Sequence, residues 1–261
     1  MCHNHSPAPP LASDVRRRLL ATPGPAAVPY VFLDAATTPP DSPAIVVATD
    51  IFGVTPFYEY LGEQLAREGW RVAVPDLFHR IGPTQDGSRD AALARRKLLD
   101  DSLAAADVAA VISSVTDGSG ATGNSPRPGF GFLGFCLGGS LALLSAAARP
   151  EQATVTYYAF PRGAPGAAVA TTAPMDVAAQ VRGPVLAFWG KEDYIDAGDV
   201  HALERELARG EADHEVRWYD DVGHSFLAGL TAEDETSAAA RDSWARSIAF
   251  FHRWLDLRSA S

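Results

Sequence analysis

The sequence predicts a single α/β domain, with a mostly parallel sheet covered by helices on both faces. Short, β-branched apolar segments alternate along the chain with segments whose apolar residues recur at helical spacing. Strands that alternate with helices need crossover connections, and these favour a doubly wound parallel sheet. The length of 261 residues allows a sizeable core, and no internal repeat or strong linker divides the chain.

Composition narrows the classes of function. Asp and Glu number 32 against 22 Lys and Arg, so no basic stripe favours a nucleic acid or a polybasic contact with a membrane surface. No apolar run is long enough to span a membrane, and the N-terminus has no apolar signal core. Cys2 and Cys136 lie far apart, which excludes a disulfide framework. We therefore expect a cytoplasmic protein with reduced thiols.

Residues 1–27 are predicted to form an N-terminal tail or arm, and residues 28–258 the domain. The first segment is rich in Pro, Ala and Ser and carries one basic cluster, Arg16 to Arg18. Its Cys2, His3 and His5 are too few for a closed metal site, so no metal is expected. The first two strands are predicted over 28–34 and 44–49, because both are short apolar runs rich in β-branched residues.

A helix is predicted next, with Thr55 as N-cap and Pro56 at the first helical position. Its residues Phe57, Leu61 and Leu65 fall on one face, and it ends near Gly69. A strand over 71–75 follows. One long helix is then predicted over 89–115, with an apolar stripe through Leu99, Leu103, Ala106 and Ala110.

The second half of the domain begins after a surface loop rich in Gly, Ser and Pro, residues 117–129. Its strands are predicted over 129–135, 154–160, 184–189 and 214–219. Its helices are predicted over 140–149, 199–209 and 232–257, the last with a buried stripe formed by Trp244, Ile248, Phe251 and Leu255.

The segment Gly134-Phe135-Cys136-Leu137-Gly138-Gly139 has the pattern of a nucleophile elbow, between an apolar strand and a helix of small residues. A sharp turn from strand to helix forces the central Cys136 into strained geometry and projects its side chain above the sheet edge. The helix N-terminus favours a thiolate, and the N–H of Leu137 becomes one donor of an oxyanion hole. The alternative is that Cys136 is a small buried hydrophobic residue.

Partners for such a nucleophile follow in the order nucleophile, acid, histidine. Asp193 comes directly after the strand over 184–189, and His224 follows the strand over 214–219. His224 is thus placed to act as the base, with Asp193 fixing its tautomer. Taken singly, Asp193 would be a loop or cap acid and His224 a surface histidine. With the elbow they predict a Cys-His-Asp triad.

These features resemble the dienelactone hydrolase family of α/β-hydrolases, whose nucleophile is a cysteine. The resemblance is carried by Ile51-Phe52-Gly53, Pro75-Asp76-Leu77-Phe78, GFCLGG, Tyr157-Tyr158, the Asp193 loop and Gly-His-Ser-Phe at 223–226. It implies hydrolysis of small lactones or esters through a thioester acyl-enzyme, without metal or organic cofactor. It also implies that the N–H of Ile51 is the second oxyanion donor. We expect the protein to be a monomer or homodimer.

The resemblance also suggests pocket residues. Tyr158 matches a tyrosine near the family's active site, and Phe52 is a further candidate for the pocket. His79 and Arg80 lie just past the third predicted strand, near the expected pocket rim; the alternatives are a surface histidine and an exposed loop arginine. Asp50 stands where members often carry a glutamate that assists deprotonation of the thiol, and its side chain is one methylene shorter. Ala228 stands where enzymes acting on an anionic lactone tend to carry an arginine.

Two alternatives share this fold. One is a hydrolase of other acyl compounds, such as thioesters. The other is a binding or redox-sensing protein that uses Cys136 as a reversible thiol, and it would leave the complete triad idle.

Overall fold

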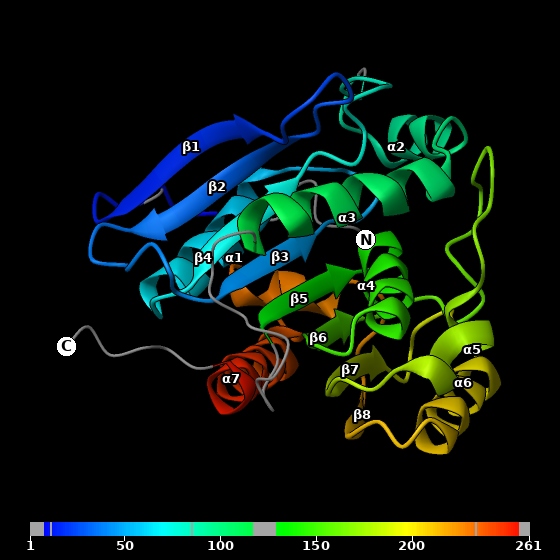
Figure 1. Ribbon diagram of the computed structural model, residues 1–261. Helices are drawn as coiled ribbons and strands as arrows, with labels where there is room; N and C mark the ends of the chain where they lie inside the picture. The colour runs from blue at the N-terminus through cyan, green and yellow to red at the C-terminus, as the bar shows by residue number, and fades with distance from the viewer. Residues whose placement is uncertain (1–7, 11, 85, 117–128, 233, 256–261) are drawn as a thin grey trace.

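The protein folds around an eight-stranded sheet with the order β1-β2-β4-β3-β5-β6-β7-β8 (Figure 1). The computed structural model describes residues 8–10, 12–84, 86–116, 129–232 and 234–255. The predicted loop at 117–128 and the cluster Cys2, His3 and His5 lie outside these ranges. The strands are β1 (Val15–Ala21), β2 (Pro29–Ala35), β3 (Ala44–Ala48), β4 (Arg71–Pro75), β5 (Phe130–Phe135), β6 (Gln152–Tyr157), β7 (Val185–Gly190) and β8 (His214–Tyr219).

The strands from β4 through β3 to β8 run parallel, and only the first two pairings, β1 with β2 and β2 with β4, are antiparallel. This confirms the predicted mostly parallel sheet. The long helices are α1 (Pro56–Arg67), α2 (Arg89–Arg96), α3 (Asp101–Thr116), α4 (Leu137–Ala148), α6 (Ala197–Arg209) and α7 (Ser237–Trp254). Shorter turns of helix are α5 (Pro174–Val177), η2 (Ala178–Gln180) and η3 (Phe226–Leu230).

Helices cover the sheet on both faces, as predicted. The apolar residues of α3 and of the first turns of α4 pack on one face, against Phe32, Val46 and Phe132. Those of α1 and α7 pack on the other face, against side chains that alternate with them along the same strands, such as Val47 and Leu133. Figure 1 shows α3 crossing in front of the strands and α1 behind them.

The sheet begins earlier than residue 28, so the prediction of a tail or arm for the whole of 1–27 is wrong. Residues Val15–Ala21 form β1, paired along its whole length with β2. The basic cluster is what fastens this edge strand: Arg16 and Arg18 both donate to Asp34, at 2.6 and 3.1 Å, and Arg17 donates to Glu59 of α1 at 2.6 Å. Arginines that alternate between two acidic partners are compatible with a strand, because successive side chains point to opposite faces.

The predicted long helix over 89–115 is two helices, α2 and α3. Asp100 interrupts it, because its Oδ1 accepts hydrogen bonds from the N–H groups of Ser102 and Leu103, at 2.8 and 3.0 Å, as an N-cap does. The predicted stripe is also wrong in its phase. Leu103 is 47% exposed, and the buried face is formed by Ala104, Val108, Val111, Ile112 and Val115.

Other boundaries differ by a few residues. The helix α4 begins at Leu137, directly after Cys136, and not at residue 140. The closing helix α7 is shorter than predicted; Phe251 and Leu255 of its stripe are buried, while Trp244 and Ile248 are partly buried. No helix in the described ranges is both long and apolar enough to cross a membrane.

A buried ion pair closes the junction between α2 and α3. Arg96 donates two hydrogen bonds of 2.7 Å to the carboxylate of Asp101, and a third, of 2.8 Å, to the carbonyl of Ala164. Both charged side chains are buried, with 1% and 6% exposed. The pair therefore fixes α2, α3 and the loop that follows β6 to one another.

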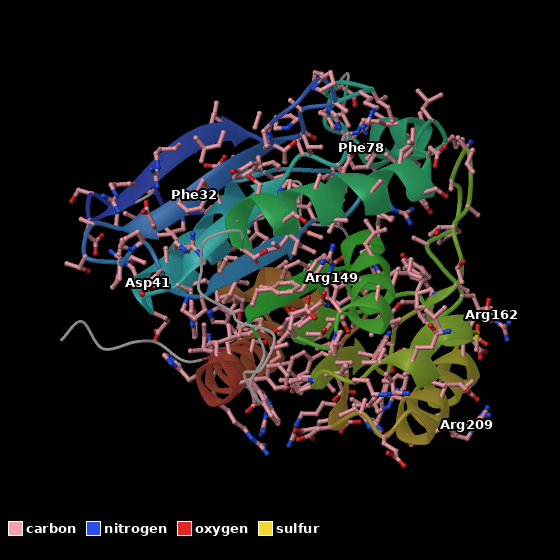
Figure 2. The ribbon with its side chains drawn as sticks, in the orientation of Figure 1. Phe32, Asp41, Phe78, Arg149, Arg162 and Arg209 are labelled. Atoms are coloured by element: carbon pink, nitrogen blue, oxygen red, sulfur yellow. The ribbon has the colours of Figure 1, made fainter. Side chains whose placement is uncertain are left out.

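We predict that Asp101→Asn lowers the free energy of unfolding by about 3 kcal/mol, because it leaves the Arg96 charge buried without its counter-ion. The matched control is Glu206→Gln, which removes the partner of Arg209 on the surface of α6 (Figure 2) and should cost less than about 1 kcal/mol. Urea unfolding followed by circular dichroism measures both. An equal decrease in the free energy of unfolding of the two variants would show that burial of the Arg96–Asp101 pair does not contribute to stability.

Candidate active site

Most of the predicted site residues lie at one edge of the sheet, where the parallel strands end. Asp50 follows β3 by two residues, and Cys136 comes directly after β5. Tyr158 comes directly after β6, and the loops that follow β7 and β8 bring Asp193 and His224 to the same edge. Ligand sites of open α/β sheets form at this carboxyl edge, because the strand ends leave a crevice there.

Cys136 occupies a strained turn between β5 and α4. Its backbone has φ 55° and ψ -115°, a conformation rarely adopted by residues other than glycine, and its N–H donates to the carbonyl of Tyr157 at 3.0 Å. The side chain is buried, with 4% of the residue exposed. The structure thus reproduces the backbone that the elbow pattern predicts, and strain of this kind is typical of functional turns.

Two glycines make this turn possible by their close backbone contacts. A Cβ atom on Gly134 would lie 2.3 Å from the carbonyl oxygen of Gly138, and one on Gly138 would lie 2.1 Å from that of Ala48. The N–H of Gly138 also donates to the carbonyl of Thr49 at 3.1 Å. The first turn of α4 is therefore locked against the end of β3, which sets the height of Cys136 above the sheet.

His224 and Asp193 form a buried pair across the ends of β8 and β7. Nδ1 of His224 lies 3.1 and 3.0 Å from the two carboxylate oxygens of Asp193. Their side chains are 4% and 1% exposed. The two loops are also joined by backbone contacts, because the N–H of Glu192 donates to the carbonyl of Val222 at 3.0 Å and Gly190 lies directly under the same carbonyl.

The other ring nitrogen of His224, Nε2, is buried and has no hydrogen-bond partner among the described residues. Three aromatic rings enclose the imidazole: Tyr194 at 4.7 Å, Tyr158 at 4.8 Å and Phe160 at 5.6 Å between ring centroids. A buried polar atom without a hydrogen-bond partner carries a desolvation cost, which is unusual in a folded protein. This nitrogen is also the one that a general base would use to take a proton.

The two amides predicted as oxyanion donors also meet at this edge. Leu137 is the first residue of α4, where backbone N–H groups have no partner inside the helix. Ile51 lies in the turn after β3, to which the first turn of α4 is hydrogen-bonded. No hydrogen bond between described residues uses the N–H of Ile51 or of Leu137. Phe52, the next residue of that turn, is buried and packs on Ala92 of α2.

Asp50 belongs to a fully buried acidic cluster. Its Oδ1 accepts a hydrogen bond of 2.8 Å from the N–H of Phe52. The phenol of Tyr58, on α1, lies near Asp50, Tyr158 and Cys136. Burial raises the pKa of Tyr58 well above its usual value, and the three acidic neighbours raise the pKa further. Asp50, Tyr58, Cys136 and Tyr158 therefore share one electrostatic environment.

His79 and Arg80 turn toward α3. His79 Nε2 lies 3.1 Å from Oδ2 of Asp107, and Arg80 binds both oxygens of the same carboxylate, with Nη2 2.7 Å from Oδ1. The hydrogen bond to Asp107 raises the pKa of the Arg80 guanidinium. Both residues thus engage a structural acid, and the contacts that the structure records for them lie outside the cluster around Cys136.

Sequence reasoning missed three residues of this region: Tyr58, Tyr194 and Arg95. Tyr58 lies on the buried face of α1, next to Phe57, and the spacing of that face was the available signal. Tyr194 directly follows Asp193, so its position could have been inferred. Arg95 lies on α2 and had no signal, because the group that it binds, the carbonyl of Ile51, is 44 positions away in the sequence. Among the described residues, no cluster of His, Cys, Asp and Glu could hold a metal ion.

Proteins similar to this chain point to one family. The sequence pattern of the dienelactone hydrolase family matches residues 31–255. A carboxymethylenebutenolidase from Rhodococcus opacus is 50% identical over 262 residues, covering 100% of both chains. One from Pseudomonas putida is 27% identical over 205 residues, covering 76% of this chain and 81% of its own.

A crystal structure of a dienelactone hydrolase from Anabaena variabilis has the same fold. It superposes with a TM-score of 0.62 at 18% identity, covering 93% of this chain and 100% of its own. The sheet order, the strained turn after β5 and the family match lead to one conclusion: the chain belongs to the dienelactone hydrolase family and has the α/β-hydrolase fold.

Proposed function

We propose that this protein hydrolyses small carboxylic esters or lactones, with Cys136 as nucleophile, His224 as general base and Asp193 as the residue that orients His224. The observation that carries the proposal is the buried His224–Asp193 pair, whose free Nε2 belongs to the same sheet edge as the strained Cys136 turn. Full-length similarity to a carboxymethylenebutenolidase supports a lactone as the substrate class.

In the first half-reaction, Nε2 of His224 takes the proton from Sγ of Cys136. The thiolate attacks the carbonyl carbon of the substrate, forming a C–S bond, and the π electrons move onto the carbonyl oxygen. The N–H groups of Ile51 and Leu137 stabilise this oxyanion. Collapse of the tetrahedral intermediate breaks the C–O bond, and the departing alkoxide takes the proton from His224. In a lactone the alkoxide stays attached to the acyl chain, so the ring opens and leaves a thioester.

In the second half-reaction, His224 removes a proton from water, and the hydroxide adds to the thioester carbonyl. The same two amides hold the new oxyanion. Collapse breaks the C–S bond, the departing thiolate of Cys136 takes the proton back from His224, and the carboxylic acid is released. Asp193 accepts a hydrogen bond from Nδ1 throughout, which keeps Nε2 as the reactive nitrogen and stabilises the imidazolium that forms. The cycle needs these side chains and water.

Asp50 is proposed to manage the proton of the resting thiol. Its carboxylate is fully buried beside Tyr58, in the environment that also contains Cys136. A carboxylate there favours the neutral thiol over the thiolate, because two negative charges would repel each other. A neutral thiol resists oxidation, since the thiolate is the reactive form. The alternative to this catalytic role is a structural one, in which Asp50 only caps its turn by accepting the hydrogen bond from the N–H of Phe52.

Cys136→Ala is predicted to abolish hydrolysis of p-nitrophenyl acetate while the protein remains folded, because no acyl acceptor remains. The rate should fall by several orders of magnitude, as is usual when one member of a triad is removed. Cys136→Ser should also be poor, because a hydroxyl requires a stronger base than a thiol beside His224. Iodoacetamide should inactivate the wild type. Near wild-type turnover of Cys136→Ala would contradict the assignment of the nucleophile.

Asp50→Asn is predicted to lower turnover sharply, because an amide cannot share the proton of the Cys136 thiol as a carboxylate can. The free energy of unfolding should change little, because asparagine caps a turn nearly as well as aspartate. The pH dependence of thiol alkylation should shift toward lower pH, since removal of the negative charge makes the thiolate easier to form. Steady-state kinetics and the alkylation rate between pH 5 and pH 9 (roughly the range in which a thiol titrates) measure these effects. If kinetics and alkylation were both unchanged, Asp50 would have only the capping role.

A further inference from the structure

The turn that carries the Ile51 amide is a β-turn over residues 50–53, closed by a hydrogen bond of 3.1 Å from the N–H of Gly53 to the carbonyl of Asp50. This bond involves the peptide between Asp50 and Ile51, which includes the Ile51 N–H, but it lies within the turn and does not anchor the turn to the rest of the molecule. The central peptide, between Ile51 and Phe52, takes no part in the closing bond. Its orientation is the feature that distinguishes type I from type II turns, so it is the adjustable part of the turn.

Both ends of that central peptide are held by charged side chains. The N–H of Phe52 donates to Oδ1 of Asp50 at 2.8 Å. On the opposite side, Nη2 of Arg95 donates to the carbonyl of Ile51 at 2.9 Å, a buried contact between residues 44 positions apart. The central peptide of the turn over residues 50–53 therefore cannot rotate without breaking one charge-assisted hydrogen bond at each of its ends.

Arg95 is buried, and its guanidinium is held by stacking and by hydrogen bonds. It lies on α2 with 8% of its surface exposed, and its guanidinium carbon stacks 3.9 Å from the centre of the Phe78 ring. Its Nη1 donates to the carbonyl of Gly82 at 3.1 Å. Figure 2 shows Phe78 beside α2. One rigid fork thus joins the turn after β3 to the loop after β4.

Burial of the Arg95 guanidinium disfavours its charged form. Desolvation lowers the pKa of the Arg95 guanidinium, and the negative charges of Asp76 and Asp50 partly offset that effect. The cation is retained in a part of α2 that already packs on the turn through Ala92 against Ile51 and Phe52. Apolar packing is non-directional and cannot orient a peptide, whereas two hydrogen bonds from a planar fork can.

We propose that Arg95 is a positioning residue for the oxyanion hole: its hydrogen bond to the carbonyl of Ile51 anchors the turn to α2, so that the N–H of the same residue stays directed at the developing oxyanion. This role rests on the proposed function. It is specific to the guanidinium, because an ammonium would keep the charge but could not bind two carbonyls from one plane. Arg95 need not contact the substrate.

Arg95→Lys is expected to lower kcat about 10- to 100-fold and to change KM less than about 2-fold, since a donor displaced by an ångström loses most of its effect in the transition state alone. An aldehyde inhibitor, which forms a hemithioacetal with an oxygen in the same hole, should bind more weakly by the same factor. Alkylation by iodoacetamide needs no oxyanion donor, so its rate should match the wild type. The matched control is Arg89→Lys, an exposed arginine on the same helix, which should leave all three measurements unchanged.

Unchanged kcat and aldehyde binding in folded Arg95→Lys would overturn the inference. If Arg95→Lys fails to fold, Arg95→Gln, which keeps an amide NH2 donor, takes its place. Unchanged kcat and unchanged aldehyde binding in Arg95→Gln would likewise overturn the inference. Loss of alkylation together with loss of turnover would also contradict it, because Arg95 would then act on the thiol. The proposed function is tested separately. An inactive wild type or an active Cys136→Ala would contradict the proposed hydrolase function. Normal activity of the Arg95 variants, together with an inactive Cys136→Ala, would contradict only the positioning role of Arg95.

Discussion

Cys136 is held at a positive φ because β5 and α4 meet with no space between their backbones. Gly134 and Gly138 remove the two Cβ atoms that would collide with neighbouring carbonyls, and the N–H of Gly138 is tied to the end of β3. Such strain costs about 1–3 kcal/mol and persists only where the surroundings determine it. Here the surroundings are β3 and β5, two central strands of the sheet, so the position of the thiol is set by the middle of the sheet.

The other groups of the site are arranged around that fixed point by the ends of neighbouring strands. β3 supplies the turn with Asp50 and Ile51, β6 supplies Tyr158, and β7 and β8 supply the Asp193–His224 pair. Negative or acidic groups dominate this edge, and the buried Arg95 is a cation set among them. The proposed chemistry uses this balance: the carboxylates govern protons on sulfur and imidazole, while neutral amides receive the charge that develops on oxygen.

The local features of the site could be predicted because each depends on a few adjacent residues. The GFCLGG turn, the Thr55-Pro56 helix start and the strand over 71–75 are read from short patterns, and the structure has all three. Features that depend on distant partners could not be predicted. Arg16 to Arg18 look like a solvated tail until Asp34 and Glu59 are found opposite them. Asp100 looks like one more helical residue until its side chain caps α3, and Arg95 looks like a surface arginine until its Nη2 is found at the carbonyl of Ile51, 44 positions away.

The central claim is that an acyl group passes through Cys136. The most direct measurement is mass spectrometry of the wild-type protein quenched in acid during turnover of a slowly hydrolysed ester. We expect an added mass equal to the acyl group, located by peptide mapping on Cys136 and removed by hydroxylamine at neutral pH, as is usual for a thioester. An acyl group on another residue, or active turnover with no covalent adduct under conditions where deacylation limits the rate, would contradict it.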